Sequence, residues 1–160
     1  MKWLADRSLI RVEGADARSF LQGVITQDAP AHHDGARFGA LLSPQGKILF
    51  DFFLIPTERG YLVDCASSLC GALLKRLSMY RLRAVVEIAL EPALAVGFAE
   101  HEAATQGARI AFADPRTPQL LWRAIAPTES MQGDGAAEYR DLRYRIGVAQ
   151  CGDDFPSDSL

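Results

Sequence analysis

One aspartate stands in the middle of an apolar run: residues 48–55 read ILFDFFLI, and Asp51 is their single charged side chain. Alternate side chains of a β-strand point to opposite faces. Both faces are apolar here, which predicts a central strand covered on both sides. A buried, unpaired carboxylate costs several kcal/mol or has its pKa raised, by roughly 3 units if fully buried. Asp51 is therefore either a structural group satisfied by backbone N–H groups or an arginine, or a functional carboxylate in a ligand cavity.

A second polar feature is the cluster Thr26, Gln27 and Asp28, which precedes Pro30. Short polar side chains before a proline are typical of turns. The same three side chains lie between an expected helix and the following strand, where they would form the polar rim of a pocket. The sequence leaves both interpretations open.

The frame that positions Asp51 spans residues 37–55, which we predict to be two antiparallel strands joined by a tight turn. Ser43, Pro44 and Gly46 occupy the first, second and fourth positions of the turn. This pattern is typical of a type I turn, because proline fixes the backbone dihedral that its position requires.

The other elements follow from the spacing of apolar residues. Leucines and a tyrosine repeat at four-, four- and three-residue spacing over residues 69–80, which predicts an amphipathic helix capped by Ser67. Asp16 is expected to cap a shorter helix upstream. We expect a last helix over residues 136–146, and further strands over residues 9–12, 61–65, 84–90, 94–99, 108–112 and 119–126.

Length and composition bound the class of protein. At 160 residues the chain is long enough for one domain or two closely packed halves, and 49% hydrophobic and 23% charged residues are typical of a globular protein. A net charge of -3 gives no electrostatic case for direct nucleic-acid binding or for a membrane surface. The first nine residues lack the apolar run of a secretory signal, so we expect a cytoplasmic protein without a membrane span.

The thiols and imidazoles do not suggest a metal site. Cys65, Cys70 and Cys151 lack paired C-x-x-C spacing, so reduced thiols are expected. The first two should be core residues, whereas Cys151, beside a glycine and two aspartates, should be an exposed or boundary thiol. His32 and His33 lie in a loop without a third ligand at metal spacing.

A cationic group follows the second expected helix. Lys75, Arg76, Arg81 and Arg83 lie at or after its last turns. Cations there complement the negative end of the helix dipole. The alternative is an anion site for the carboxylate of a ligand.

Four segments together resemble the folate-binding proteins of the YgfZ type, which are relatives of the aminomethyltransferase (T-protein) of the glycine cleavage system. They are FLQGVITQD at 20–28, LLSPQGKILFDFFL at 41–54, LLKRLSMYRLRAVVEI at 73–88 and LRYRIGVAQ at 142–150. The family's Lys-Gly-Cys-Tyr-x-Gly-Gln-Glu motif and its C-terminal β-barrel are absent, so the chain resembles an N-terminal portion. The T-protein also has paired aspartates where this chain reads Phe50-Asp51.

The resemblance implies an α+β fold of antiparallel sheets with packed helices, built as two ferredoxin-like halves of an aminomethyltransferase-like folate-binding domain. These halves would be residues 1–90 and 91–160, the second incomplete at its C-terminus. They would surround a central cavity for tetrahydrofolate. The resemblance assigns folate binding to Thr26, Gln27, Asp28, Asp51 and Arg143. Arg143 would meet the acidic tail of the ligand through its planar guanidinium, unless it lies on a solvated helix face.

The function implied is that of a tetrahydrofolate-binding accessory protein for iron–sulfur cluster assembly or repair, which indirectly supports tRNA modification. Its partners would be folate and iron–sulfur enzymes. Two alternatives remain. The first is a tetrahydrofolate-dependent aminomethyl transferase in which Asp51 places the folate nitrogen, and the second is a non-catalytic interaction module or fragment. Because the cysteine motif and barrel are absent, we expect weak folate binding and no support of iron–sulfur enzymes by this portion alone.

Overall fold

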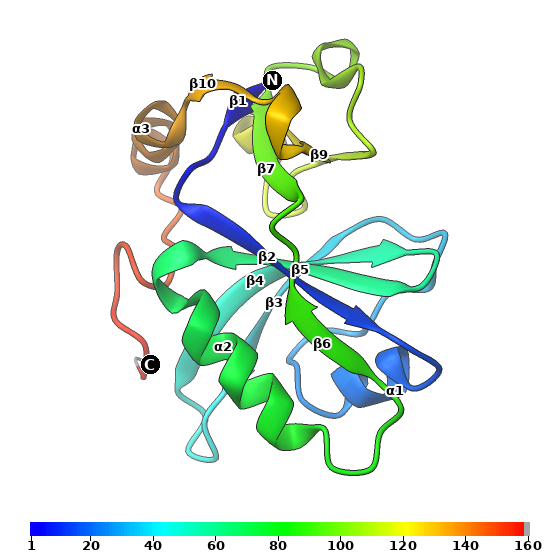
Figure 1. Ribbon diagram of the computed structural model, residues 1–160. Coiled ribbons are helices and arrows are strands. Elements are labelled where there is room, and N and C mark those ends of the chain that lie inside the picture. Colours follow the sequence, from blue (N-terminus) through cyan, green and yellow to red (C-terminus); the bar gives the residue numbers. More distant parts are fainter. Residues whose placement is uncertain (159–160) are drawn as a thin grey trace.

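A computed structural model describes residues 1–158 as two five-stranded sheets with three α-helices around them (Figure 1). The first sheet has the order β3 (Arg37–Leu42), β4 (Ile48–Thr57), β5 (Gly60–Ala66), β2 (Arg7–Glu13), β6 (Glu87–Leu90). The second has the order β10 (Gln132–Asp134), β1 (Lys2–Trp3), β7 (Leu94–Ala99), β9 (Trp122–Pro127), β8 (Ile110–Ala113). The helices are α1 (Ala17–Gln22), α2 (Ser67–Tyr80) and α3 (Ala136–Ile146), with short 3₁₀ helices at Glu102–Thr105, Pro118–Leu120 and Thr128–Ser130.

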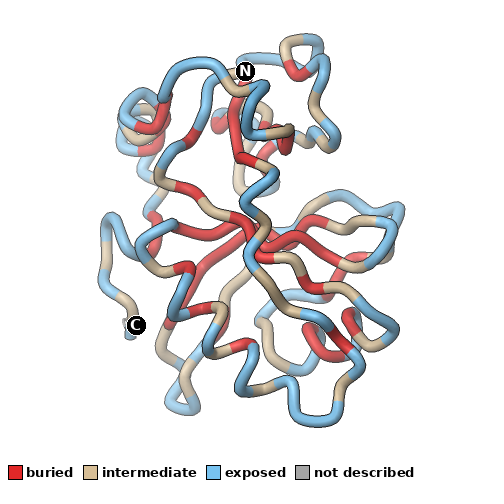
Figure 2. The backbone as a smooth tube through the Cα atoms, viewed as in Figure 1, coloured by how far each residue is buried: buried red, intermediate tan, exposed pale blue. Residues whose placement is uncertain are grey.

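The first sheet lies between two apolar cores, and β4 contributes to both. Phe52 and Leu54 join the core that contains residues of α1 and α2. Phe53 and Ile55, on the opposite face, join the core shared with the second sheet and α3. The buried residues accordingly run through the middle of the molecule (Figure 2). The prediction of a central strand covered on both faces is confirmed.

The predicted hairpin is also confirmed. β3 and β4 pair antiparallel, with Ala40 opposite Asp51. The turn closes with a 2.9 Å hydrogen bond from Gly46 N to Ser43 O. Gly46 has φ +83°, a left-handed conformation that glycine adopts without the steric cost of a side chain.

Both predicted helix caps are wrong in detail. α1 begins after Asp16, but the Asp16 carboxylate accepts a hydrogen bond from Val85 N at 2.7 Å and makes none to its own helix. Ser67 is the first residue of α2, and its hydroxyl bonds to Ser8 Oγ at 2.7 Å. In each case a polar side chain that could have capped the helix instead ties two distant segments together.

The first strand of the chain belongs to the second sheet, an arrangement that the sequence did not predict. β1 pairs antiparallel with β7 and parallel with β10. Gly97 permits this close approach, because a Cβ atom there would lie 2.7 Å from Lys2 O. β6 is shorter than predicted and begins at Glu87. Within the described residues, the longest helix has 14 residues, and none is long and apolar enough to cross a membrane.

Candidate functional site

Asp51 is buried in the N-terminal half of β4, and its carboxylate Oδ2 accepts a 2.8 Å hydrogen bond from Cys151 N. Residues 150–158, termed the C-terminal segment, cover this end of the strand, because Ser157 Oγ donates to Leu49 O at 2.8 Å and Asp158 N to Ile48 O at 2.8 Å. Burial raises the pKa of Asp51, and the Cys151 N–H and the charge of Arg7 oppose that rise. The observed partner is a backbone N–H group, as one of the two interpretations of Asp51 requires.

A buried ion cluster lies on the same face of the first sheet. Asp64, on β5, accepts two hydrogen bonds from arginines. Arg7 Nε donates to its Oδ1 at 2.7 Å, and Arg123 Nη2 donates to its Oδ2 at 2.6 Å. Arg123 comes from β9, so Asp64 links the two sheets. All three side chains are nearly inaccessible to solvent.

The cluster continues around the ring of Phe53. The Tyr139 hydroxyl accepts a 3.0 Å hydrogen bond from Arg123 Nη1 and donates one of 2.9 Å to Asp114 Oδ2. Arg116 donates two hydrogen bonds, of 2.9 and 3.0 Å, to the same Asp114 carboxylate. Arg123 and Arg116 lie over the Phe53 ring, 4.1 and 4.8 Å from its centroid. Burial alone would raise the pKa of Asp114, but the Arg116 hydrogen bond and the Arg123 charge lower it.

The sequence reasoning missed this cluster, although one signal was present. Asp64 interrupts the apolar strand YLVDCA just as Asp51 interrupts β4, so the same argument predicts a buried, paired carboxylate. Arg123, inside the apolar stretch of β9, is the matching cation. Asp114 and Arg116 lie outside strands and carry no comparable signal.

Thr26, Gln27 and Asp28 are exposed at the outer edge of β3. Thr26 N donates to Ala40 O, and Thr26 Oγ1 accepts from Ala40 N, both at 2.9 Å. Gln27 Oε1 accepts from Asp28 N, and Asp28 Oδ1 accepts from Gln22 Nε2, both at 3.1 Å. Thr26 is bonded to the edge of β3, the contacts of Gln27 and Asp28 are short-range, and a strand separates all three side chains from the Asp51 carboxylate.

Arg143 is held by the C-terminal segment. Its Nη1 donates to Asp154 at 2.5 Å and to Val148 O at 3.0 Å, and its Nη2 donates to Asp153 at 2.8 Å. With 1% of the residue exposed, the interpretation as a solvated helix face is wrong. The guanidinium already binds two carboxylates, so an acidic ligand tail would have to compete with both.

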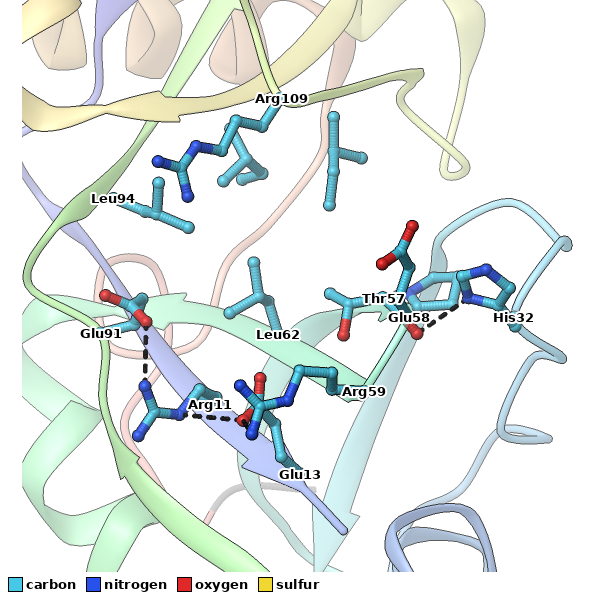
Figure 3. A pocket seen from close by; sticks show the side chains of 13 residues that line it. Arg11, Glu13, His32, Thr57, Glu58, Arg59, Leu62, Glu91, Leu94 and Arg109 are labelled. Carbon is cyan, nitrogen blue, oxygen red and sulfur yellow. Dashed lines mark hydrogen bonds and ion pairs between the residues drawn. The ribbon is translucent and has the colours of Figure 1, made fainter. Parts of the chain in front are cut away.

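An open cleft of about 500 Å³ lies at the other end of the space between the sheets (Figure 3). Its apolar wall includes Leu62 from the first sheet with Leu94 and Ile125 from the second. Thr57 and His32 close one side, where His32 Nδ1 bonds to Thr57 O at 2.9 Å. None of the residues predicted to bind folate lines this cleft.

The charged side chains at the rim of the cleft differ in whether another side chain pairs with them. Arg11 contacts Glu87 at 2.7 Å and Glu91 at 3.4 Å. By contrast, the Arg109 guanidinium, which reaches over the cleft from the second sheet, has no hydrogen-bond or ion-pair partner in residues 1–158 (Figure 3). Two buried polar atoms of the lining, Arg11 Nε and Thr57 Oγ1, make no hydrogen bond within the described chain. Such a site can bind a ligand with a flat apolar body, hydrogen-bonding edges and an acidic group.

The three cysteines are buried. Cys65 Sγ donates to Ser8 O at 3.8 Å. The neighbouring Cys70 thiol and burial raise the pKa of the Cys65 thiol, and the Cys65 thiol lowers the pKa of Cys70. Their prediction as core residues is confirmed. The prediction of an exposed or boundary thiol at Cys151 is wrong, because the C-terminal segment packs it against β4, where its Sγ lies 3.7 Å from Leu49 O. No group of three or more potential metal ligands forms in the part of the chain that the structure describes.

Comparison with known proteins gives a consistent set of relatives. The chain is 31% identical over 185 residues to the mitochondrial iron–sulfur cluster assembly factor IBA57 of Homo sapiens, covering 96% of the chain and 52% of the relative. It is 32% identical to the factor of Mus musculus, with the same coverage, and 31% identical to the homologue of Pyricularia oryzae, covering 92% of the chain and 42% of the relative. No protein-family model matches.

Among solved structures, the aminomethyltransferase T of the glycine cleavage system from Bartonella henselae superimposes with a TM-score of 0.72 and 16% identity. The match covers 98% of this chain and 53% of that one. The predicted aminomethyltransferase-like α+β fold is therefore confirmed. The chain spans about half the length of the curated relatives it matches.

These comparisons contradict the cytoplasmic prediction, because the relatives are named as mitochondrial proteins. The prediction rested on the absence of an apolar secretory signal. That feature does not distinguish cytoplasmic from mitochondrial proteins, whose targeting sequences are amphipathic and not continuously apolar.

Proposed function

We propose that this chain acts in iron–sulfur cluster assembly or repair as an accessory protein that binds a tetrahydrofolate, and so supports iron–sulfur enzymes, including those that modify tRNA. The observation that carries the proposal is the match over 96% of the chain to a factor named for iron–sulfur cluster assembly. The folate part of the proposal rests on the resemblance to the T-protein, whose fold the chain shares.

Two places between the sheets are candidates for the folate, and the open cleft fits it better. Its volume of about 500 Å³ is in the range of small-molecule sites. A pterin ring would cover the apolar wall. Thr57 Oγ1 and Arg11 Nε, neither of which makes a hydrogen bond within the described residues, would meet its polar edges, and Arg109 would meet the glutamate carboxylate. At the second place, near Asp51, the ligand would have to displace the C-terminal segment from the carboxylate.

Calorimetric titration with tetrahydrofolate separates the two places. A charge-assisted hydrogen bond contributes roughly 1.5 to 3 kcal/mol, so Arg109→Gln should weaken binding about tenfold or more if the ligand occupies the cleft. Asp51→Asn should then change the affinity less than about twofold. The reverse pattern would place the ligand at Asp51. Arg145→Gln, which replaces an exposed arginine far along the chain, is the matched control. If neither the wild type nor any variant releases or absorbs heat on titration with tetrahydrofolate, folate binding is removed from the proposal.

The assembly role needs a separate test in cells that lack their own related factor. The proposed role predicts that the chain restores the activity of an iron–sulfur enzyme, whereas the absence of the cysteine motif and barrel predicts no recovery by this portion alone. A tRNA-modifying iron–sulfur enzyme tests the finer proposal. Production of the chain at a normal level with no recovery of any iron–sulfur enzyme would contradict the role of this portion. Recovery by an Arg109→Gln chain that no longer binds folate would separate the assembly role from the ligand.

An aminomethyl transferase is the second candidate, and the fold shared with aminomethyltransferase T favours it. The single carboxylate at Phe50-Asp51, already bonded to Cys151 N, speaks against it. Transfer of an aminomethyl carbon to tetrahydrofolate, followed as methylenetetrahydrofolate formed, should be absent. A turnover that Asp51→Asn abolishes would establish the transferase instead.

A further inference from the structure

The end of α2 and the loop after it expose apolar side chains that nothing in the described chain covers. Leu82 is 89% exposed, Val85 66% and Met79 61%. Most other large apolar side chains fill the two cores, and the next most exposed within the described residues are Tyr144 at 55% and Leu90 at 52%. We call this region the α2-end surface; it consists of Lys75, Arg76, Met79, Arg81, Leu82, Arg83 and Val85.

Four cations accompany these apolar side chains. Lys75 and Arg76 lie four and three residues before Met79, so they share its face of the helix. Arg81 and Arg83 flank Leu82. No ion pair or side-chain hydrogen bond to residues 1–158 neutralises any of the four, although the whole chain carries a net charge of -3. The α2-end surface is therefore a strongly cationic patch on an acidic protein.

Two hydrogen bonds tie the loop after α2 to Asp16. Asp16 bonds to Val85 through both its carboxylate, at 2.7 Å from Val85 N, and its own backbone N, at 3.3 Å from Val85 O. Leu82 has φ +42°, a left-handed conformation that is strained for a leucine. Strain is tolerated where the surrounding structure enforces it, and here the side chain gains no burial in return. The fold thus presents Leu82 outward in a prepared geometry.

The shape and size of the surface favour a lipid bilayer over a protein partner. The loop after α2 lies at one extremity of the molecule, where a planar surface can reach it (Figure 1). Three apolar side chains offer less area than the roughly 800 Å² that each partner buries in a stable protein interface. Shallow insertion of a few apolar groups beside a cluster of cations is the usual geometry of interfacial binding to anionic lipid.

We propose that the α2-end surface docks this protein peripherally on an anionic phospholipid bilayer. Leu82, Met79 and Val85 enter the boundary between headgroups and acyl chains, and the four cations contact lipid phosphates and carboxylates. Net charge averaged over the chain conceals this surface, because the cations are concentrated in nine residues, 75–83. The association needs no membrane-spanning helix.

Sedimentation with vesicles tests the proposal on the full chain. Vesicles of phosphatidylcholine and phosphatidylserine should bind the protein, vesicles of phosphatidylcholine alone should not, and salt should weaken the binding. Removing one cation near an anionic surface lowers the partition coefficient about fivefold, so the double variant Arg81→Gln/Arg83→Gln should bind about 25-fold more weakly. Leu82→Asn tolerates the left-handed conformation and should bind about tenfold more weakly through lost apolar contact.

The matched control is Arg37→Gln/Arg145→Gln, which makes the same change in net charge on exposed arginines elsewhere and should leave binding unchanged. Equal weakening by both double variants would show attraction to net charge and overturn the proposal. So would an unchanged affinity of Leu82→Asn, or no binding to the anionic vesicles at low salt. The last result would leave an acidic protein as the occupant of the surface.

Discussion

The space between the two sheets has a closed end and an open end that use similar side chains differently. At the closed end, Asp64 and Asp114 bind three arginines, of which Arg7 and Arg123 are nearly inaccessible to solvent and Arg116 has 8% of its side chain exposed. At the open end, the Arg109 guanidinium has no partner among residues 1–158, and Arg59 makes one contact of 3.6 Å while 79% of its side chain stays exposed. The same chemistry therefore holds the sheets together at one end and remains available to a ligand at the other.

The largest effect is expected at the closed end. Asp64→Ala leaves Arg7 and Arg123 buried without their shared carboxylate, and breaking a buried ion pair from one side costs about 3 to 5 kcal/mol. Urea unfolding followed by circular dichroism measures the loss. Glu138→Gln, which removes the exposed pair with Lys2, is the control and should cost under about 1 kcal/mol. If the two variants lost the same free energy of unfolding, buried and exposed ion pairs would contribute equally to stability, and the comparison would fail.

Asp114→Asn should destabilise the protein by about 2 kcal/mol at neutral pH, because it removes the charge that Arg116 and Arg123 bind. The folded-state pKa of Asp114 lies below its unfolded value. Its contribution is therefore present above the unfolded pKa and is lost as the pH falls through the folded pKa. Unfolding curves of the wild type and variant should converge below about pH 4. If the difference in unfolding free energy stayed constant to lower pH, the charge of Asp114 would not be the source of its stabilising effect.

Asp51→Asn should have a smaller effect of opposite sign. Because burial raises the folded-state pKa of Asp51, its favourable contribution is present below the unfolded pKa and is lost as the pH rises through the folded pKa. The variant should thus equal the wild type at neutral pH or exceed it by up to about 1 kcal/mol, and lose that advantage in acid. A loss of several kcal/mol at pH 7 would show that the ionised carboxylate stabilises the closed end.

The smallest effect is expected at the open end. Arg109→Gln should change the free energy of unfolding by less than about 0.5 kcal/mol, since the guanidinium is exposed and unpaired within residues 1–158. Thermal unfolding of the ligand-free protein measures this. With a bound ligand the wild type should gain stability and the variant should gain less, which separates a binding role from a structural one.

The sequence by itself determined the elements whose causes are local. The apolar run over residues 48–55 predicted β4 and its two covered faces, the Ser43–Gly46 turn predicted the hairpin, and the leucine spacing over residues 69–80 predicted α2. The resemblance carried by four segments gave the aminomethyltransferase-like fold. The assignment of the two halves and of the folate residues remains a prediction.

Only the tertiary structure decided which charged groups meet. Asp64 and Arg123 are separated by 59 residues, and Asp51 and Cys151 N by 100, so no local pattern could pair them. The same reason explains the error at Cys151, whose polar neighbours suggested exposure until the C-terminal segment packed against β4. It also explains β1, too short to show alternation. Propensity and periodicity act over a few residues, whereas the burial of a charge depends on what the rest of the chain places against it.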